Sequence, residues 1–534
     1  MATCGEVLIG ILEAYGVEVV FGIPGVHNVE LYRGLAGSAI RHVTPRHEQG
    51  AGFMADGYAR ATGRPGVCFT ITGPGLTNIL TAMGQAYSDS VPMLVIASVN
   101  SLAEMGTGNG HLHELKSQRA LAEGVTAFSH TVTHPAQLPE VIARAMAVFA
   151  GSRPRPVYIE IPVDVITAPG DALPLRARPL PLPPQPPAVA LEAAACLLGA
   201  AARPLVVLGG GAAGAPQAAR SLAEALDAPV IMTINARGLL PPDHPLIAGE
   251  ILTAPPLLAA LGEADVVLAV GTEFGETEMY PWPAPLVING ALVRIDIDPQ
   301  QIMRGPVADV ALVGDAGLAM RALCDGLPAV AMRAGATRAA ALRAATQAAL
   351  PAATAPYRRV METIDAILPD AIVVGDSTQT VYFANQFYRP ARPRSFFNAS
   401  TGYGTLGYGL PAAIGARIGE PERPVIALVG DGGVLFTIGE LAAAVEAQAP
   451  VIVILWNNDG YGEIRSYMEA RSITPVGVDL KVPDFMRIAE GFGCAAERVK
   501  SFAGLADALI AANERLVPTV IEIHAGAAFV RETA

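Results

Sequence analysis

The residue types best suited to chemistry stand in two polar segments, each directly after a short apolar run. Residues 425–429 lead into Gly-Asp-Gly-Gly at 430–433, and residues 451–455 lead into Trp-Asn-Asn-Asp-Gly-Tyr at 456–461. Mg²⁺ prefers six oxygen ligands and takes only one or two of them from carboxylates. Asp431 offers a carboxylate oxygen, Asn458 an amide oxygen and Gly460 a backbone carbonyl, which together predict a magnesium site.

The two glycines after Asp431 extend this prediction to a diphosphate. Gly432 and Gly433 let the backbone approach an anion at the start of a helix, where free N–H groups favour negative charge. Asp431 and Asn458 are 27 positions apart. A strand–helix–strand unit fits this spacing and puts both at the carboxyl ends of parallel strands, where such sheets bind ligands. Gly-Asp-Gly and Asn-Asp-Gly are also common turn sequences, but the spacing and the strand context favour the metal diphosphate site.

A carboxylate far from these segments, Glu48, is a second candidate for chemistry. It lies in Arg-His-Glu-Gln-Gly at 46–50, before a helical stretch that runs to Arg60. Gly-Asp-Gly followed about 30 residues later by Asn-Asn resembles the thiamine diphosphate signature. Chemistry on that cofactor needs one carboxylate beside the aminopyrimidine, because a proton shared there favours the imino form that deprotonates the reactive carbon. Taken alone, Glu48 is better explained as an acid in the first turn of a helix, where the macrodipole stabilises it.

Apolar runs that alternate with helical stretches would position these groups. Each run is bounded by Gly, Pro, Asp or Asn and has the composition of a parallel strand buried on both faces, which predicts an α/β fold. The runs are residues 17–21, 66–71, 93–98, 157–161, 205–208, 266–270, 372–374, 425–429 and 451–455.

The length of 534 residues predicts three or four domains. A proline-dense stretch, RPLPLPPQPPA at 178–188, indicates an extended linker, and an Ala-rich, aperiodic stretch near residues 329–356 indicates a second boundary. We therefore divide the chain into a first domain (1–170), a linker (171–189), a central domain (190–330), a second linker (331–355) and a last domain (356–534).

Composition argues against several classes of protein. The net charge of −13 argues against a nucleic-acid partner, and no apolar stretch reaches the ~18 residues of a membrane helix. Acidic residues interrupt the apolar pattern of the N-terminus, which argues against a signal peptide. The five cysteines are scattered without a CxxC pair, as in a reduced cytosolic protein. We expect a cytoplasmic protein without nucleic-acid or membrane partners.

The segment RHEQGAGFMADGYAR at 46–60 resembles the acetolactate synthase-like thiamine diphosphate-dependent enzymes, a family that includes benzoylformate and pyruvate decarboxylases. Counterparts follow in order along the whole chain: FGIPG (21–25), TGPGLTN (72–78), RPVYIEIPVDV (155–165), RIDIDP (294–299) and GYGLPAAIGA (407–416). The resemblance implies thiamine diphosphate and Mg²⁺ as cofactors. It also implies three doubly wound parallel-sheet domains: pyrimidine-binding, Rossmann-like central and diphosphate-binding.

The same resemblance implies active sites between subunits, with Glu48 of one chain facing the cofactor held by another. A homodimer is then the functional minimum and a homotetramer the usual state. Leu406 matches the bulky residue that supports the V shape of thiamine, and the Gly404 carbonyl would accept a hydrogen bond from the aminopyrimidine. The other matches near the cofactor are Gly25, Glu48, Asn78, Gln379, Thr380, Gly432, Gly433 and Tyr461. Val26, Glu463 and Ile464 match positions near the substrate.

A Gly-rich segment at 209–214, GGGAAG, fits the dinucleotide pattern. That pattern needs an acidic residue about 20 positions on, but the next strand ends in Asn235-Ala236-Arg237. We interpret these glycines as close-packing positions of a Rossmann-like domain. We therefore do not expect FAD, which anabolic acetolactate synthases hold in this domain, or an NAD-linked dehydrogenase.

The sequence departs from the acetolactate synthases where their activity should show. Their Phe-Gln-Glu and Lys-His segments correspond to Leu112-His113-Glu114 and Ser129-His130, so the lysine is missing. His113 and Glu114 could form the proton relay. Glu463 replaces an apolar pocket residue and would pair with a cationic substrate group, above all a guanidinium. It could instead cap its helix or pair with Arg465 or Arg471.

Two segments, NNDGYGEIR at 457–465 and MADGYAR at 54–60, resemble in particular the 5-guanidino-2-oxopentanoate decarboxylases. The favoured function is decarboxylation of a 2-oxo acid, with 5-guanidino-2-oxopentanoate giving 4-guanidinobutanal and CO₂ as the specific expectation. The alternatives are carboligation of two pyruvates to acetolactate and a benzoylformate-type decarboxylation. A cofactor-binding protein without turnover is a further alternative, against which the intact Glu48, Asp431 and Asn458 argue.

Overall fold

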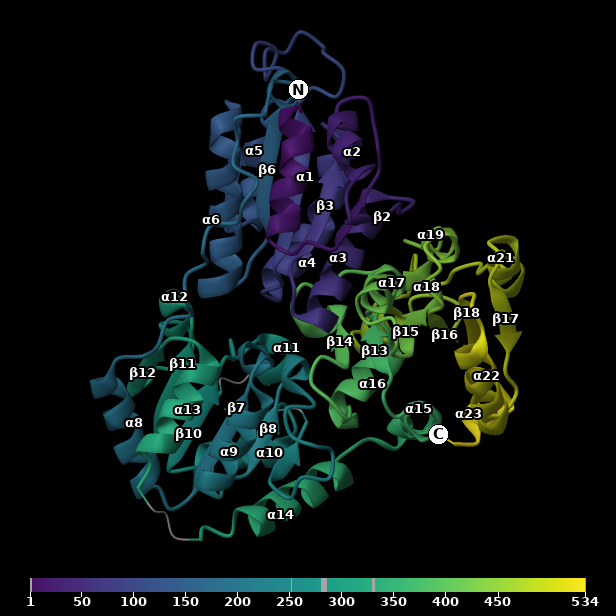
Figure 1. The fold of residues 1–534 in the computed structure, drawn as a ribbon. Helices are drawn as coiled ribbons and strands as arrows, with labels where there is room; N and C mark the ends of the chain where they lie inside the picture. Colours follow the sequence, from purple (N-terminus) through teal and green to yellow (C-terminus); the bar gives the residue numbers. More distant parts are fainter. Residues whose placement is uncertain (1, 251, 280–285, 329–331, 534) are drawn as a thin grey trace.

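The structure, a computed structural model, describes residues 2–250, 252–279, 286–328 and 332–533. They form three six-stranded sheets, each flanked by helices (Figure 1). The strand orders are β2-β1-β3-β4-β6-β5, β12-β11-β10-β7-β8-β9 and β14-β13-β15-β16-β18-β17, and every pairing between these strands is parallel. The predicted α/β class with three parallel-sheet domains is confirmed.

The first sheet carries the predicted acid on one of its two covered faces. Its strands are β1 (Val19–Gly22), β2 (Arg41–Val43), β3 (Gly66–Thr70), β4 (Met93–Val99), β5 (Phe128–Thr131) and β6 (Val157–Pro162). One face packs on α1 (Cys4–Ala14), α2 (Val29–Leu35) and α6 (Leu138–Gly151), and the other on α3 (Glu48–Thr62) and α4 (Pro74–Ser88). Helix α3 starts after the N-cap His47 and ends at Gly63, whose φ of +76° suits glycine.

The third sheet carries the predicted metal loop. Its strands are β13 (Ile372–Gly375), β14 (Phe396–Asn398), β15 (Val425–Gly430), β16 (Ile452–Asn457), β17 (Ala495–Arg498) and β18 (Thr519–His524). One face packs on α15 (Ala355–Ile367), α16 (Gln379–Phe387) and α22 (Phe502–Glu514). The other packs on α17 (Gly409–Gly419), α18 (Asp431–Val434), α19 (Glu440–Glu446) and α21 (Phe485–Gly491). Helix α20 (Gly462–Ala470) follows the metal loop.

The central sheet consists of β7 (Pro204–Leu208), β8 (Val230–Met232), β9 (Ile247–Gly249), β10 (Val266–Val270), β11 (Ala291–Asp296) and β12 (Val310–Val313). Helices α8 (Ala188–Ala200), α9 (Pro216–Leu226) and α13 (Ala316–Gly326) cover one face, and α10 (Pro255–Glu263) and α14 (Gly335–Ala348) cover the other. In the Gly-rich loop, a Cβ atom on Gly209 would collide with the Gly271 carbonyl. This glycine therefore serves close backbone packing, the role that the sequence suggested.

The two predicted linkers differ in structure. No helix or strand lies between α7 (Val163–Ile166) and α8, so the proline-dense segment runs without regular structure. The second linker, residues 331–355, instead contains the whole of helix α14, whose buried Ala339 packs on the central domain. The predicted boundary at residues 330–331 lies outside the described residues, and the domain bounds stay predictions.

The first and third domains share one hydrophobic core, in which α3 lies against α17 between the two sheets. Two glycines allow this contact. A Cβ atom on Gly57 would collide with the Ala412 carbonyl, and one on Gly415 with the Met54 carbonyl. The two domains that carry Glu48 and Asp431 are therefore held in a fixed relation within one chain.

The close contact between α3 and α17 can be tested by its effect on the free energy of unfolding. We expect Gly415→Ala to lower the free energy of unfolding by about 1–3 kcal/mol, because overpacking a buried contact costs this much. In an open helix the same change stabilises by up to ~1 kcal/mol, since glycine is a poor helix former. Gly491→Ala is the matched control, because its added Cβ meets nothing within 4 Å. Urea unfolding of both variants measures the difference, and equal midpoints would contradict the assigned contact.

Candidate active site

Asp431 and Asn458 meet at the carboxyl ends of the neighbouring strands β15 and β16. The strand register pairs Gly430 with Trp456, which brings the residues that follow them together. The Asp431 carboxylate, only 1% exposed, accepts hydrogen bonds from the backbone N–H of Gly460 (2.7 Å) and of Asn458 (3.4 Å). Burial raises the pKa of Asp431, while these backbone hydrogen bonds oppose the rise. A bound cation would stabilise the same ionised carboxylate.

Three oxygen atoms converge at this point, and one of them belongs to the Asp431 carboxylate. Asn458 Oδ1 lies 2.8 Å from the Gly460 carbonyl oxygen and 3.1 Å from Asp431 Oδ1, while Asn458 Nδ2 donates to Gln379 Oε1 at 3.1 Å. Turning the amide over would bring its nitrogen to the first two oxygens, but its oxygen would then face Gln379 Oε1. A cation between the three oxygens satisfies all of these groups at once. One carboxylate, one amide and one carbonyl oxygen form a donor set that suits Mg²⁺.

The residues predicted for the diphosphate surround this point. Gln379 begins α16, and its Oε1 also accepts from the Tyr357 hydroxyl at 3.3 Å. Thr380 beside it is buried, and its Oγ1 has no hydrogen-bond partner among the described residues. The Tyr461 ring lies over Gly432, where a Cβ atom would come within 2.7 Å of the ring. Helices α16 and α18 both begin at this edge of the sheet.

The loop that contains Gly404 and Leu406 is held by Asp376, which the sequence analysis did not single out. This buried carboxylate accepts from the backbone N–H of Gly407 (3.2 Å) and of Gly409 (3.1 Å), on both sides of the turn after Leu406. Burial raises the pKa of Asp376 to about 6, although backbone hydrogen bonds act in the opposite direction. The signal was available, because Asp376 directly follows a buried strand that ends at the same edge as β15.

Glu48 begins α3 and is 8% exposed. Its Oε2 accepts from Asn78 Nδ2 at 2.9 Å, so two predicted cofactor residues are in contact. Glu440, from α19 of the third domain, accepts from the backbone N–H of Arg46 (3.0 Å) and His47 (3.1 Å), directly before Glu48. Burial raises the pKa of Glu440 to about 7, opposed by these hydrogen bonds. The third domain thus holds the start of the helix that carries the acid.

Comparison with known protein families matches three parts of the chain. Residues 2–121 match the thiamine pyrophosphate enzyme N-terminal TPP binding domain, residues 191–323 the central domain, and residues 376–523 the C-terminal TPP binding domain. The chain belongs to the thiamine pyrophosphate enzyme family. Thiamine pyrophosphate is the thiamine diphosphate of the sequence analysis, and the two matched binding domains contain Glu48 and the metal loop respectively.

Whole-length relatives place the chain within this family. A probable 2-ketoarginine decarboxylase AruI of Pseudomonas aeruginosa is 49% identical, with 98% of this chain and 94% of the relative covered. A probable acetolactate synthase large subunit of Methanocaldococcus jannaschii is 33% identical, with 93% and 87% covered. The acetolactate synthase isozyme 1 large subunit of Escherichia coli is also 33% identical, with 92% and 88% covered.

Glu114, one of the two residues predicted for the proton relay of this thiamine pyrophosphate enzyme, is held by backbone hydrogen bonds. Its carboxylate accepts from the backbone N–H of Gly108 (2.6 Å), Gly110 (3.0 Å) and His111 (3.1 Å). These hydrogen bonds lower its pKa. An anion fixed in this way holds the loop in shape, and the relay role of Glu114 stays a prediction.

His113, from the same loop, remains a candidate for the relay. Its φ of +61° is unusual for a residue other than glycine. The backbone there packs so closely on Gly73, before α4, that a Cβ atom on Gly73 would lie 2.5 Å from the His113 carbonyl oxygen. Asn100 Nδ2 also donates to the Leu112 carbonyl at 2.9 Å. The His113 ring is therefore held beside the helix that supports Glu48 through Asn78.

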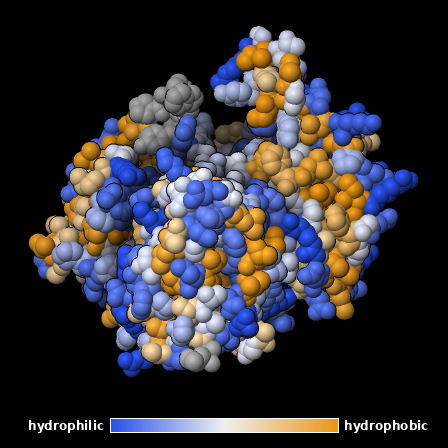
Figure 2. Space-filling model, turned by 90° about the horizontal axis from the view of Figure 1, so that it is seen from above, coloured by the Kyte–Doolittle hydropathy of each residue, from blue (hydrophilic) through white to orange (hydrophobic). Residues whose placement is uncertain are grey.

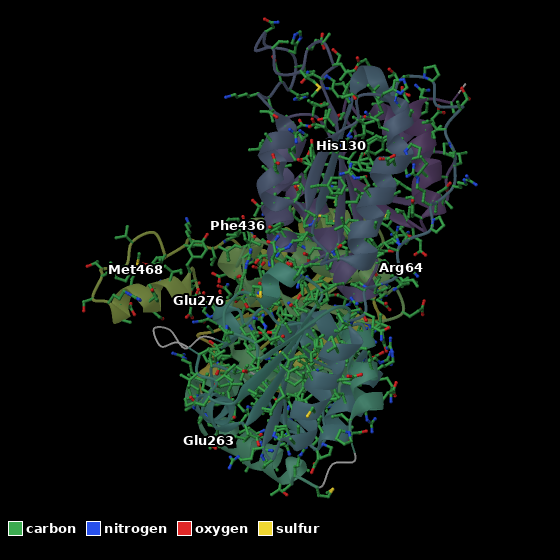
Figure 3. The ribbon with its side chains drawn as sticks, turned by 90° about the vertical axis from the view of Figure 1, so that its left-hand side faces the viewer. Arg64, His130, Glu263, Glu276, Phe436 and Met468 are labelled. Carbon is green, nitrogen blue, oxygen red and sulfur yellow. The ribbon has the colours of Figure 1, made fainter. Side chains whose placement is uncertain are left out.

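The residues predicted for the substrate lie at the surface of the single chain. Val26 is 66% exposed and Ile464 is 51% exposed. Helix α20, which carries Glu463 and Met468, stands out from the body of the molecule (Figure 3). In the described part of the chain, no hydrogen bond or ion pair joins Val26 to α20. The structure therefore brings together the cofactor residues of each domain, but it does not bring the three substrate residues together.

Glu463 has neither of the arginine partners considered for it. Arg465 pairs with Asp479, and the Arg471 guanidinium lies over the Tyr467 ring, 3.6 Å from its centroid. The charge of Glu463 acts instead on Tyr357 and Tyr382, the first of which hydrogen-bonds Gln379 at the metal loop. The carboxylate is exposed and has no ion-pair partner among the described residues, so it is free to bind a cation.

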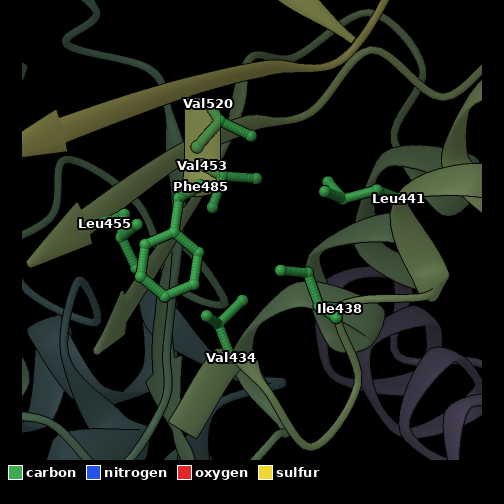
Figure 4. Close-up of a pocket in the computed structure, with 7 residues that line it drawn as sticks. All are labelled: Val434, Ile438, Leu441, Val453, Leu455, Phe485 and Val520. Atoms are coloured by element: carbon green, nitrogen blue, oxygen red, sulfur yellow. The ribbon is translucent and has the colours of Figure 1, made fainter. Parts of the chain in front are cut away.

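A small cavity near the metal loop is a different feature. Figure 4 shows it between the sheet and the segment after α18. Its lining is wholly apolar and consists of Val434, Ile438, Leu441, Val453, Leu455, Phe485 and Val520. Because no polar group faces it, this cavity cannot orient a 2-oxo acid or a diphosphate, and we regard it as a packing gap in the shared core.

Proposed function

We propose that this thiamine pyrophosphate enzyme is a Mg²⁺-dependent 2-oxo acid decarboxylase. The observation that carries the proposal is the meeting of the Asp431 carboxylate, the Asn458 amide and the Gly460 carbonyl at the head of the metal loop. These residues would hold Mg²⁺, and Gly432, Gly433, Gln379, Thr380 and Tyr461 would surround the diphosphate. When bound, thiamine diphosphate supplies the carbon nucleophile and accepts the electron pair that CO₂ leaves behind.

The residues of the chain divide the remaining work. Glu48, fixed by Asn78 at the start of α3, would share a proton with the aminopyrimidine nitrogen. Leu406 would pack against the cofactor and the Gly404 carbonyl would accept a hydrogen bond from its amino group, while Asp376 holds the loop that carries both residues. Gly25 and Val26 lie in the loop after β1, at the carboxyl edge of the first sheet, where Glu48 also lies. His113 would exchange protons with the substrate carbon.

We further propose that a homodimer is the smallest active unit and a homotetramer the usual state. Within one chain the Leu406 loop rests on α4 at Gly84 and Gln85. Asn78, which holds Glu48, is six residues nearer the start of that helix, roughly 9 Å at 1.5 Å per residue. This separation favours a Glu48 supplied by a second chain. Apolar residues gathered in groups on one face suit such contacts (Figure 2).

The proposed location is the cytoplasm. Within the described ranges, no helix combines the length and the apolar composition that crossing a bilayer requires. The free cysteines, three of them buried, suit a reducing compartment. The domain bounds at 170, 190, 331 and 356 are likewise part of the proposal, supported by the places of the three sheets in the chain.

The proposed substrate is 5-guanidino-2-oxopentanoate, converted to 4-guanidinobutanal and CO₂. Two observations support it: the free carboxylate of Glu463, and 49% identity to a relative named for 2-ketoarginine. A guanidinium forms two parallel hydrogen bonds to a carboxylate, which gives both affinity and orientation. Carboligation to acetolactate is the second candidate, favoured by the acetolactate synthase relatives at 33% identity. Decarboxylation of a benzoylformate-like acid remains the third.

A panel of 2-oxo acids on the wild type and Glu463→Gln tests the substrate. We expect kcat/KM for 5-guanidino-2-oxopentanoate to fall roughly 10- to 100-fold in the variant, because a hydrogen bond between charged groups contributes about 1.5–3 kcal/mol. Uncharged 2-oxo acids should lose much less. Glu469→Gln, an exposed glutamate on the same helix, is the matched control. An unchanged profile, or acetolactate formed from pyruvate with the higher kcat/KM, would reject the guanidinium substrate.

A further inference from the structure

His27 is a half-buried histidine to which neither the sequence motifs nor the proposed mechanism gives a part. It lies in the loop after β1, directly after Gly25 and Val26. The fully buried Asn28 fixes this loop, because its Oδ1 accepts from the Gly25 N–H (2.7 Å) and its Nδ2 donates to the Ile23 carbonyl (3.2 Å). The His27 ring is thus held among residues expected to contact the cofactor and the substrate.

The ring of His27 meets the ring of His113. Their centroids are 5.5 Å apart and their planes stand at 90°, so the edge of one ring faces the other. Each ring has a rigid support: Asn28 fixes the loop of His27, and Asn100 together with Gly73 fixes the loop of His113. Two separate loops of the first domain therefore bring two imidazoles together at the edge of the sheet where Glu48 lies.

The two nitrogens of His27 differ in their surroundings. Nδ1 is buried and has no hydrogen-bond partner in the described part of the chain, whereas Nε2 is not among the buried unpartnered atoms. A buried N–H without an acceptor costs about 1–3 kcal/mol, more than a buried lone pair. The neutral tautomer with its proton on Nε2 is therefore favoured, and protonation of Nδ1 is disfavoured.

Electrostatics acts in the same direction. Burial, then the like charge of a protonated His113, lower the pKa of His27, and Glu104 opposes them. Glu104 also lies 3.6 Å from His111 Nδ1, so part of its charge is shared with that imidazole. Of two imidazoles this close, only one is readily protonated at a time. The buried, unpartnered Nδ1 and the adjacent ring therefore favour a neutral His27.

We propose that His27 is the positioning partner of His113 in the proton relay of this enzyme. Its ring is neutral and carries its proton on Nε2, while the buried Nδ1 has none. This inference rests on the proposed decarboxylation. That reaction converts a 2-oxo carboxylate and one proton into an aldehyde and CO₂, with no change in the number of electrons. The carbon–carboxylate bond breaks, its electron pair forms the new C–H bond with a proton from His113, and His113 regains its proton from solvent.

Three substitutions of His27 separate this role from simple packing. Gln can place an N–H near the position of Nε2, Asn places one near Nδ1, and Phe keeps the ring shape without either. We expect His27→Phe and His27→Asn to lower kcat about 10- to 100-fold, a part of the ~10²–10⁴ that a general acid contributes, with KM little changed. His27→Gln should recover most of this activity. Slower protonation should also raise the share of acyloin over aldehyde in the two slow variants.

Titration of the histidines supplies a readout that does not depend on turnover. With ¹³C-labelled histidine, the Cε1–H signals of the thiamine diphosphate- and Mg²⁺-loaded enzyme are followed against pH in the wild type and in His113→Asn. Removing His113 should raise the pKa of His27, because it removes a neighbouring positive charge. An unchanged His27 titration would overturn the pairing. So would wild-type kcat and product ratio in His27→Phe, or an equal loss of cofactor affinity in all three His27 variants.

The proposed decarboxylation and the proposed pairing of His27 with His113 can be rejected separately. A wild-type enzyme that releases no CO₂ from any 2-oxo acid overturns the proposed function, and the titration still decides the pairing. If the wild type turns over normally and His27→Phe has the same kcat and product ratio, only the pairing of His27 with His113 is overturned.

Discussion

Glu48→Gln is expected to lower the turnover of 2-oxo acids by about 10²- to 10⁴-fold, the range for loss of a positioned proton-transfer group. Gln cannot share a proton with the aminopyrimidine nitrogen, but it can still accept the hydrogen bond from Asn78. Binding of thiamine diphosphate should therefore change little. Steady-state CO₂ release and calorimetric titration of the cofactor in the presence of Mg²⁺ measure the two effects separately.

Glu140→Gln is the control for Glu48→Gln. Glu140 also lies in the first turn of a helix, α6, and its side chain is 62% exposed. Both changes remove a charge that the helix dipole stabilises by about 0.3–1 kcal/mol, but only Glu48 is proposed to act in the reaction. If both variants keep wild-type turnover, or if Glu48→Gln loses the cofactor together with activity, Glu48 is not the activating acid.

Local patterns were sufficient to predict the buried parts of this fold. Each of the nine apolar runs contributes to a strand, because a parallel strand covered on both faces must be apolar throughout. The spacing from Asp431 to Asn458 also predicted their meeting correctly, since β15 and β16 are neighbours joined by one helical crossover. In these cases the information lies within some 30 residues of chain.

Short edge strands and helix α14 did not follow from local patterns. The strands β2 (Arg41–Val43), β5 (Phe128–Thr131) and β17 (Ala495–Arg498) lie at sheet edges, where one side is open and polar residues are tolerated. Helix α14 lacks a clear amphipathic period because most of its exposed face is alanine. Packing on the central domain, which no local pattern reports, accounts for its order.

Contacts between distant segments were the hardest part of the site to predict. Glu440 holds the start of α3 although it is 394 residues from Arg46. His27 and His113 likewise meet from separate loops, and the backbone N–H groups that hold Glu114 cannot be identified from the sequence. Such residues look ordinary until the tertiary structure supplies their partners, whereas the residues of a compact motif can be recognised from their spacing.

Asp431→Asn should weaken the binding of Mg²⁺ and thiamine diphosphate about 100-fold or more. The change keeps an acceptor oxygen for the shorter of the two backbone hydrogen bonds, from the Gly460 N–H, and loses the longer one from Asn458, but above all it removes the one negative charge among the three converging oxygens. Mg²⁺ gives up its hydration water reluctantly and relies on carboxylates to replace it. At a ligand concentration of 100 times the wild-type Kd, binding stabilises the wild type by ~2.7 kcal/mol, most of which the variant should lose.

Asp459→Asn is the control for this change. Asp459 lies in the same loop, but its side chain is 58% exposed and lies 3.4 Å from His524, away from the three oxygens. Its φ of +61° also suits asparagine, so the substitution should cause no strain. Thermal unfolding with and without Mg²⁺ and thiamine diphosphate should show a large ligand-induced rise in Tm for the wild type and Asp459→Asn, and little for Asp431→Asn.

Unfolding of the ligand-free forms separates the effect on the metal site from the effect on the fold. Without ligands Asp431→Asn should unfold close to the wild-type temperature, because a buried amide costs less to desolvate than a buried carboxylate and this gain offsets the loss of the long hydrogen bond from the Asn458 N–H. A variant that is less stable without ligands would mean that Asp431 chiefly supports the loop. A variant that still gains the full ligand-induced stabilisation would mean that the cation is held elsewhere.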